Sequence, residues 1–118
     1  MKACYAILIL CFISCNTDEK FDRNKWINAD PVDRTYRKNM VNDLLNKYKF
    51  RGMPYKELIN LLGNPDNIGT EKYTDSVPVY YTVDEKYDMI DPVAGQDLIF
   101  HLNKDSVVTS VTVQKWKR

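Results

Sequence analysis

The side chains best suited to acid–base chemistry in this sequence are one histidine and a group of carboxylates that precedes it. His101 is the only histidine. Five acidic residues lie between positions 84 and 97: Asp84, Glu85, Asp88, Asp91 and Asp97. A histidine acts as a general acid or base only when a partner group positions it, and the spacing of the carboxylates matches no calcium-binding loop. We therefore expect no catalytic residue and no metal site, and we interpret the carboxylates as solvated charges.

The thiols of this sequence all lie near its beginning. Cys15 follows an apolar run that extends from Ala3 to Ile13, and the chain becomes polar immediately after it. The run is shorter than the ~20 residues that span a bilayer and fits the apolar region of a secretory signal. Phe12-Ile13-Ser14-Cys15 resembles a lipobox, which implies a signal peptide over 1–14, cleavage after Ser14 and a lipid on Cys15. The alternatives are a signal peptide cleaved elsewhere or a buried apolar helix.

Charge and composition restrict the partners of the expected mature chain, residues 15–118. Loss of Lys2 leaves 17 − 1 = 16 basic residues against 16 acidic ones, so the net charge is close to zero. A neutral chain argues against nucleic acid as a partner and against binding to anionic lipid through charge alone. With Cys15 acylated, no thiol remains for a disulfide, a zinc site or a nucleophile. We expect no small-molecule cofactor.

The segment after Cys15 is polar and has no sustained period. We interpret residues 15–29 as the lipidated cysteine and a flexible tether. Trp26 interrupts it, and we expect its side chain to pack on the folded domain or to rest at the membrane interface. Asn16 is not the aspartate associated with retention in the inner membrane of some bacteria, so sorting to the outer membrane is open. The location that we expect is the outer membrane, on its periplasmic face. The pair Asp18-Glu19 loosely resembles a surface-export signal and leaves surface exposure open.

Two helices are predicted at the start of the folded domain, which we place at residues 30–118. Over 31–49 an apolar residue recurs every four positions, from Val32 to Tyr48, as on one face of a helix. The second helix, over 54–62, begins at Pro54, and we expect Gly63 to form a left-handed C-cap before Pro65.

From position 77 the pattern alternates with a period of two, which indicates strands. Residues 77–83 form the first strand, 84–97 a charged loop, and 98–102 with 107–116 a hairpin around a tight turn. Tyr81 should face the core and Tyr80 the opposite side. The order predicts an α+β fold, ααβββ, with two N-terminal helices packed on one face of a three-stranded antiparallel sheet.

The segment between the two helices and the end of the second one carries a family resemblance. Gly52-Met53 and Leu62-Gly63-Asn64-Pro65 resemble the signature of the SmpA/OmlA, or BamE-like, lipoproteins. The resemblance implies the ααβββ fold, which the β-lactamase-inhibitor proteins also have, and structural roles for Gly52, Met53, Leu62, Gly63 and Pro65. The first helix is longer and more charged than in the subunit of the β-barrel assembly machine, so the resemblance does not assign the chain to that machine.

Without a catalytic motif, the hypothesis for function is a lipid-anchored, non-enzymatic protein–protein interaction module of the bacterial cell envelope. Its partner would be another envelope protein, in outer-membrane assembly or maintenance. Tyr80, Tyr87 and Trp26 are the candidate partner-binding residues, because aromatic side chains with a polar group are enriched in interface hot spots. The alternatives are an inhibitor or sensor domain of the envelope and a small hydrolase that uses His101 and a loop carboxylate.

Overall fold

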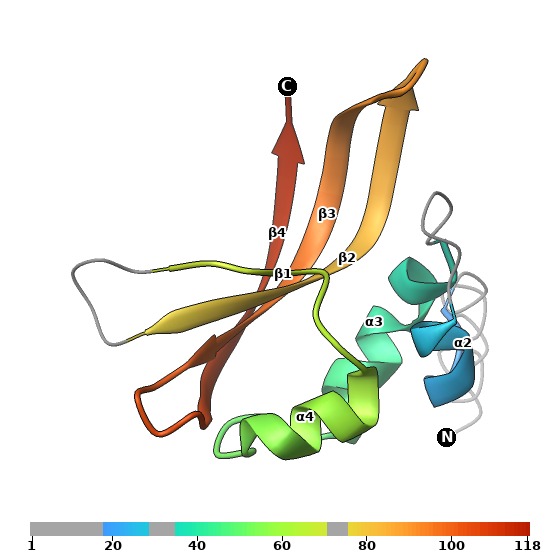
Figure 1. The fold of residues 1–118 in the computed structure, drawn as a ribbon. Helices are drawn as coiled ribbons and strands as arrows, with labels where there is room; N and C mark the ends of the chain where they lie inside the picture. The colour runs from blue at the N-terminus through green and yellow to red at the C-terminus, as the bar shows by residue number, and fades with distance from the viewer. Residues whose placement is uncertain (1–17, 29–34, 71–75) are drawn as a thin grey trace, which may run out of the picture.

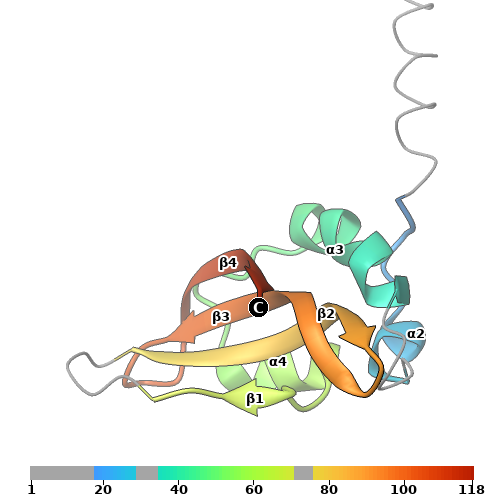
Figure 2. The ribbon, with the colours of Figure 1, turned by 90° about the horizontal axis from the view of Figure 1, so that it is seen from above.

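The computed structural model describes residues 18–28, 35–70 and 76–118, which form three helices and one antiparallel sheet (Figure 1). The helices α2 (Arg23–Ile27), α3 (Thr35–Lys47) and α4 (Tyr55–Leu62) precede the strands β1 (Asn67–Ile68), β2 (Val77–Asp88), β3 (Asp91–Leu102) and β4 (Val108–Lys117). The sheet order is β1-β2-β3-β4, with β1 beside β2 at one edge (Figure 2). Within the described segments, no helix has the length and apolar character needed to cross a membrane.

The prediction of three strands was wrong, because the sheet has four. β1 contains only two residues, paired with Val79 and Tyr80, and is too short to show an alternating pattern. The expected loop over 84–97 was also wrong, since β2 and β3 continue through it as one long hairpin. The pairing register shifts between Thr82 and Asp84 and between Lys86 and Tyr87, and pairing continues after each of these irregularities. Of the charges that suggested a loop, Asp84 lies opposite α3 and pairs with Lys38, whereas Asp88 and Asp91 lie at the closed end of the hairpin, where a strand needs no apolar face.

The helices also differ from the prediction. α2 lies inside the expected tether; Asp22 caps it by accepting a hydrogen bond from the Lys25 amide at 3.1 Å. In α3 the predicted stripe holds for Met40 and Leu44, which are fully buried, but Tyr36 is 53 % exposed and its neighbour Arg37 is buried instead. The part of the predicted helix over 31–34 lies outside the described residues. α4 agrees with the predicted segment to within one residue.

One face of the sheet carries the hydrophobic core. Tyr81 of β2 pairs with Leu98 of β3, and Phe100 lies two residues further along the same face. The helices cover this face with apolar side chains that are all buried: Trp26, Met40, Val41, Leu44, Leu58 and Leu62. Tyr81 and Phe100 make an edge-on contact with ring centroids 5.7 Å apart. Tyr81 therefore faces inward, as predicted.

The residues of the family signature have structural positions in this fold. Gly52 has φ +92°, and its amide donates to Val108 O, while Met53 O accepts from the Val108 amide, so the turn joins the start of β4. Leu62 is buried. Gly63 ends α4 with φ +78° and ψ −172°. Its ψ rules out the predicted left-handed helical C-cap and belongs to an extended region that is essentially restricted to glycine. Pro65 is partly buried.

Candidate functional site

The closed end of the β2–β3 hairpin carries an exposed apolar patch. The tip consists of Tyr87, Met89 and Ile90, whose side chains are 40 %, 93 % and 87 % exposed. Figure 1 shows this end at the top of the view, beyond the helices and with β4 beside it. Isolated exposed apolar residues are ordinary. Two adjacent aliphatic side chains that are almost fully exposed at the end of a long hairpin instead mark a candidate contact surface.

The turn itself is built against local preferences. Asp88 and Asp91 pair directly and close a two-residue turn, in which Met89 has φ +60°. Glycine is favoured at this first turn position because a side chain is strained at positive φ. Paired carboxylates across two strands repel each other as well. The residues of this turn suit neither its backbone conformation nor the pairing of two carboxylates. Such a mismatch is expected where a residue serves a function other than stability.

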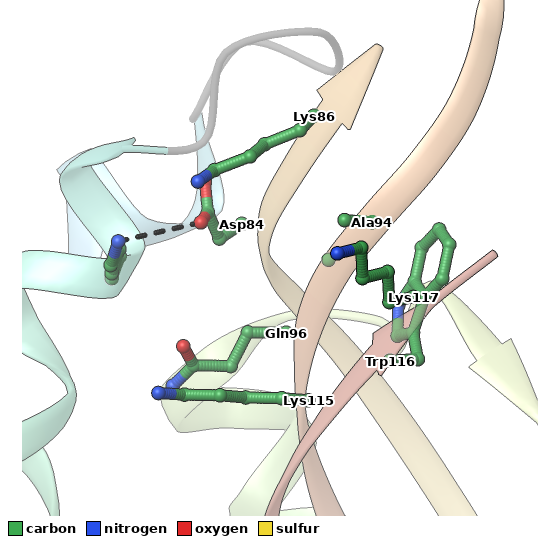
Figure 3. A pocket seen from close by; sticks show the side chains of 9 residues that line it. Asp84, Lys86, Ala94, Gln96, Lys115, Trp116 and Lys117 are labelled. Atoms are coloured by element: carbon green, nitrogen blue, oxygen red, sulfur yellow. Dashed lines mark ion pairs between the residues drawn. The ribbon is translucent and has the colours of Figure 1, made fainter. Parts of the chain in front are cut away.

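A second feature is a hollow of about 370 Å³ between α3 and the three longer strands, on the same face as the core. Lys38, Asp84, Lys86, Gln96, Lys115 and Lys117 supply its polar side chains. The ammonium group of Lys38 lies 3.4 Å from the carboxylate of Asp84. No ion pair is found for Lys86, Lys115 or Lys117 among the residues that the structure describes. Figure 3 shows side chains from all three strands directed toward the hollow between the sheet and α3.

Strand register produces this hollow. Lys86 of β2, Ala94 of β3 and Lys117 of β4 form one row across the sheet, and Asp84, Gln96 and Lys115 form the next row. Ala94 is small and leaves space between the two lysines of its row. On the other side of the sheet the indole of Trp116 covers Gly95, where an added Cβ would lie only 2.7 Å from the ring.

The sheet face opposite the core is also exposed to solvent at several positions. Ile99 is nevertheless 4 % exposed, because it lies between Tyr80 and Thr112 on the neighbouring strands. Tyr80 is partly buried, with its ring against Gly69. His101 Nε2 lies 3.4 Å from the Thr112 hydroxyl, and no ion pair of this histidine is found within the described segments.

Asp97 lies on this same exposed face, paired with Thr82 of β2. Burial raises the pKa of the Asp97 carboxyl above its usual value, and the nearby charges of Glu85 and Asp66 raise it further. A hydrogen bond with Thr82 acts in the opposite direction. Within the described residues, no cluster of histidine, cysteine and carboxylate side chains could hold a metal ion.

The three predicted partner-binding residues lie in different environments. Tyr87 belongs to the tip and its hydroxyl is 3.3 Å from a Glu85 carboxylate oxygen. Tyr80 lies on the sheet face opposite the hydrophobic core. Trp26 is fully buried, so its side chain forms no part of the protein surface. Cζ of the Arg37 guanidinium lies over the Trp26 ring, 5.1 Å from the ring centroid. Cys15, the predicted lipidation site, lies outside the described residues.

Neither the tip nor the hollow was identified from the sequence. The sequence pattern placed Met89 and Ile90 in a charged loop, because their two-residue turn lacks the glycine or asparagine that usually marks a hairpin. The lysines come from three strands, so only the pairing of these strands shows that they are neighbours. Comparison with known proteins found no match to a family model, to a characterised sequence or to a solved structure. The BamE-like resemblance therefore stays a hypothesis that rests on the quoted residues.

Proposed function

We propose that this protein is a lipid-anchored lipoprotein of the bacterial cell envelope and acts as a non-enzymatic protein–protein interaction module. The observation that carries the proposal is the tip of the β2–β3 hairpin, where Met89 and Ile90 are 93 % and 87 % exposed in a strained turn. Apolar area of this kind gains free energy only when a partner covers it. Its partner is another protein of the envelope, in assembly or maintenance of the outer membrane.

The surroundings of the tip indicate the chemistry of the partner. Asp88 and Asp91 flank Met89 and Ile90 on both sides of the turn. Insertion of the two aliphatic side chains into an apolar recess brings these carboxylates to its rim. A recess with lysine or arginine at the rim therefore matches the tip in shape and charge. Tyr87 adds an aromatic side chain to the same surface, while a contribution of Tyr80 stays a prediction.

The proposed anchor lies close to the folded domain. The Glu19 amide donates to Asn39 O at 2.9 Å and the Phe21 amide donates to Asp43 at 2.6 Å, so the chain already lies along α3 here. Only residues 16–18 lie between Cys15 and this contact at Glu19. Three extended residues span at most about 10 Å. A lipid on Cys15 therefore holds α3 close to the membrane surface instead of on a long tether.

Photo-crosslinking tests the contact surface. A photoreactive amino acid at position 90 should give one dominant adduct with an envelope protein in intact cells, and the same amino acid at position 68 should not. Ile68 is the matched control because it is also exposed, at 54 %, but lies on β1. The double substitution Met89→Gly and Ile90→Thr should abolish capture of that partner while thermal melting stays normal. Equal crosslinking from both positions would show that the tip is not the contact surface.

Radiolabelled palmitate tests the anchor separately. Cys15→Ala should abolish incorporation of label and release the protein from the membrane fraction. Each buried methylene of an acyl chain contributes about 0.8 kcal/mol, so two or three chains hold the protein firmly. Continued labelling of Cys15→Ala would disprove the lipobox interpretation without affecting the result at the tip.

A further inference from the structure

The hollow beside α3 contains more positive charge than the fold itself requires. Four lysines and a single carboxylate line it, and that carboxylate, Asp84, is already paired with Lys38. Lys86, Lys115 and Lys117 then contribute three positive charges, none of which forms an ion pair with a carboxylate of the described residues. The near-zero net charge expected for the whole mature chain conceals this local excess.

The spacing of these lysines suits one compact ligand. Adjacent strands lie about 4.8 Å apart, so Lys86 and Lys117, two strands apart, are separated by about 10 Å at their backbones. Lys115 and Lys117 are two residues apart on one face, about 7 Å. Ala94 lies between the two lysines of its row and leaves the floor open. Flexible stems of four carbons allow all three ammonium groups to reach a common anion, and the Gln96 amide adds a further donor.

The backbone under the lysines is fixed in place. Trp116 covers Gly95 on the far side of the sheet, and the Arg118 amide donates to Val93 O at 2.8 Å, so pairing with β3 continues beyond Lys117. Lysine on an edge strand also discourages pairing with other chains. That role does not require two lysines on one sheet face, whereas Lys115 and Lys117 both face the hollow together with Lys86 from β2.

We propose that this hollow binds a compact anion of the phosphate class with at least two negative charges, a phosphomonoester or a diphosphate. Lysine is a frequent phosphate ligand as a point charge, and three lysines with one amide match the several oxygens of such a group. The site is separate from the hairpin tip, so the proposal does not depend on the protein partner. The ligand comes either from solution or from a phospholipid headgroup. The lipid source needs its own test, because Asp18, close to the proposed anchor, lines the adjoining groove together with Lys38 and Gln96.

Isothermal titration of the full chain in a neutral detergent tests the proposal with two probes. Inorganic pyrophosphate represents the free ligand, and dihexanoyl phosphatidic acid, compared with dihexanoyl phosphatidylcholine, represents the headgroup. Wild type should bind at least one phosphate probe, and binding should weaken as salt is raised. The double substitution Lys115→Gln and Lys117→Gln should weaken it by roughly tenfold or more. Lys86→Gln alone should weaken it in the same direction.

The matched control is the double substitution Lys56→Gln and Lys104→Gln, which removes two exposed lysines of α4 and of the β3–β4 turn. It should leave the affinity unchanged. Lysine-dependent binding of pyrophosphate supports a free ligand, and lysine-dependent binding of phosphatidic acid alone supports a headgroup. Equal loss in the control, unchanged affinity in both hollow variants, or no binding of either probe overturns the proposal. Tighter binding of a glutamate-rich peptide than of both phosphate probes also overturns it, in favour of an acidic protein segment.

Discussion

Arg37 of α3 and Asp66, just before β1, form an ion pair with 2.8 Å between Nη1 and Oδ2, in which the arginine is buried and the aspartate partly exposed. The same guanidinium donates from Nε to Trp26 O at 2.8 Å and from Nη1 to Thr82 O at 3.1 Å. Asp66 in turn accepts from the Thr82 amide at 2.8 Å. One side chain thus links α2, α3 and the edge of the sheet, which explains how a charged residue occupies a helix position that faces the core.

Arg37→Met should destabilise the fold strongly. The substitution removes the guanidinium from the Asp66 carboxylate and removes the hydrogen bonds that Arg37 donates to Trp26 O and Thr82 O. Breaking a fully buried pair typically costs about 3–5 kcal/mol, and we expect a loss somewhat below this range because Asp66 is partly exposed. Urea unfolding measures the change. Lys38→Met is the matched control at the next position of α3, where the ion pair with Asp84 is partly exposed and contributes about 0–1 kcal/mol. Similar losses of unfolding free energy in both variants would show that the Arg37 contacts contribute no more to stability than the partly exposed pair of Lys38 and Asp84 does.

Gly63→Val should also lower the free energy of unfolding. Gly63 has φ +78°, and an added Cβ would lie 3.2 Å from Ile27 Cγ1 of α2. Strain of this backbone conformation alone costs about 1–3 kcal/mol. Gly52→Val separates the two causes, because Gly52 also has positive φ but no atom lies within 4 Å of its added Cβ. A thermal melt of each variant gives the comparison; a larger loss at Gly52 would contradict the assigned contact with α2.

Local sequence patterns predicted the elements in which one face is apolar. α4 and the β3–β4 hairpin agree with the prediction, because Leu58 and Leu62 recur at helical spacing and Leu98 and Phe100 alternate along a strand. The charged half of the long hairpin was missed for the same reason. In that half the side of the sheet that faces α3 carries Asp84, Lys86 and Gln96 instead of apolar residues, so strand formation there depends on pairing with the neighbouring strand instead of on an apolar pattern.

The candidate sites were harder to predict than the fold. Tyr87 was identified from residue type alone and lies at the tip, whereas Trp26, chosen in the same way, is buried. An aromatic residue fits a core and an interface equally well, so its type does not decide between them. The lysine-lined hollow depends on Lys86 and Lys117, 31 positions apart in the chain, lying on either side of Ala94. That arrangement follows from register, which the charged segments did not reveal.

Tyr81→Phe should remove a pH dependence of the free energy of unfolding at alkaline pH. The Tyr81 hydroxyl donates to Gly63 O at 2.7 Å, and burial, with Tyr55 and Asp66 nearby, raises its pKa above the usual 10.0. The native state therefore keeps the proton more tightly than the unfolded state. The stability that the protonated Tyr81 hydroxyl contributes is present below pH 10.0 and is lost as pH rises toward the native pKa. The free energy of unfolding then falls by up to about 1.4 kcal/mol per pH unit.

Urea unfolding of wild type and Tyr81→Phe between pH 8 and pH 11 checks this dependence. The variant should be less stable at pH 8 by about 1 kcal/mol, because Gly63 O loses its donor, and the gap should narrow above pH 10. Tyr36→Phe is the control, since Tyr36 is 53 % exposed. A constant gap over the whole range would mean that the Tyr81 hydroxyl titrates alike in the native and unfolded states.

Asp97→Asn should stabilise the protein at neutral pH. Burial, together with Glu85 and Asp66, raises the pKa of this carboxyl above the usual 3.8, so the native state binds this proton more tightly than the unfolded state does. The resulting stability is present below pH 3.8 and is lost as pH rises through the native pKa. Asparagine removes the charge, and its amide can still bond to Thr82. Because the carboxyl is partly exposed, solvent screens part of the effect and the gain is small.

Urea unfolding from pH 3 to pH 7 gives the test of Asp97→Asn. Its free energy of unfolding should exceed that of wild type at pH 7, and the two values should converge as the pH falls below 3.8. Asp105→Asn removes the same charge from an exposed position of the β3–β4 turn and corrects for the change in net charge. A variant less stable than wild type at pH 7 would show that the Asp97 carboxylate makes a favourable contact that outweighs its burial and its repulsion by Glu85.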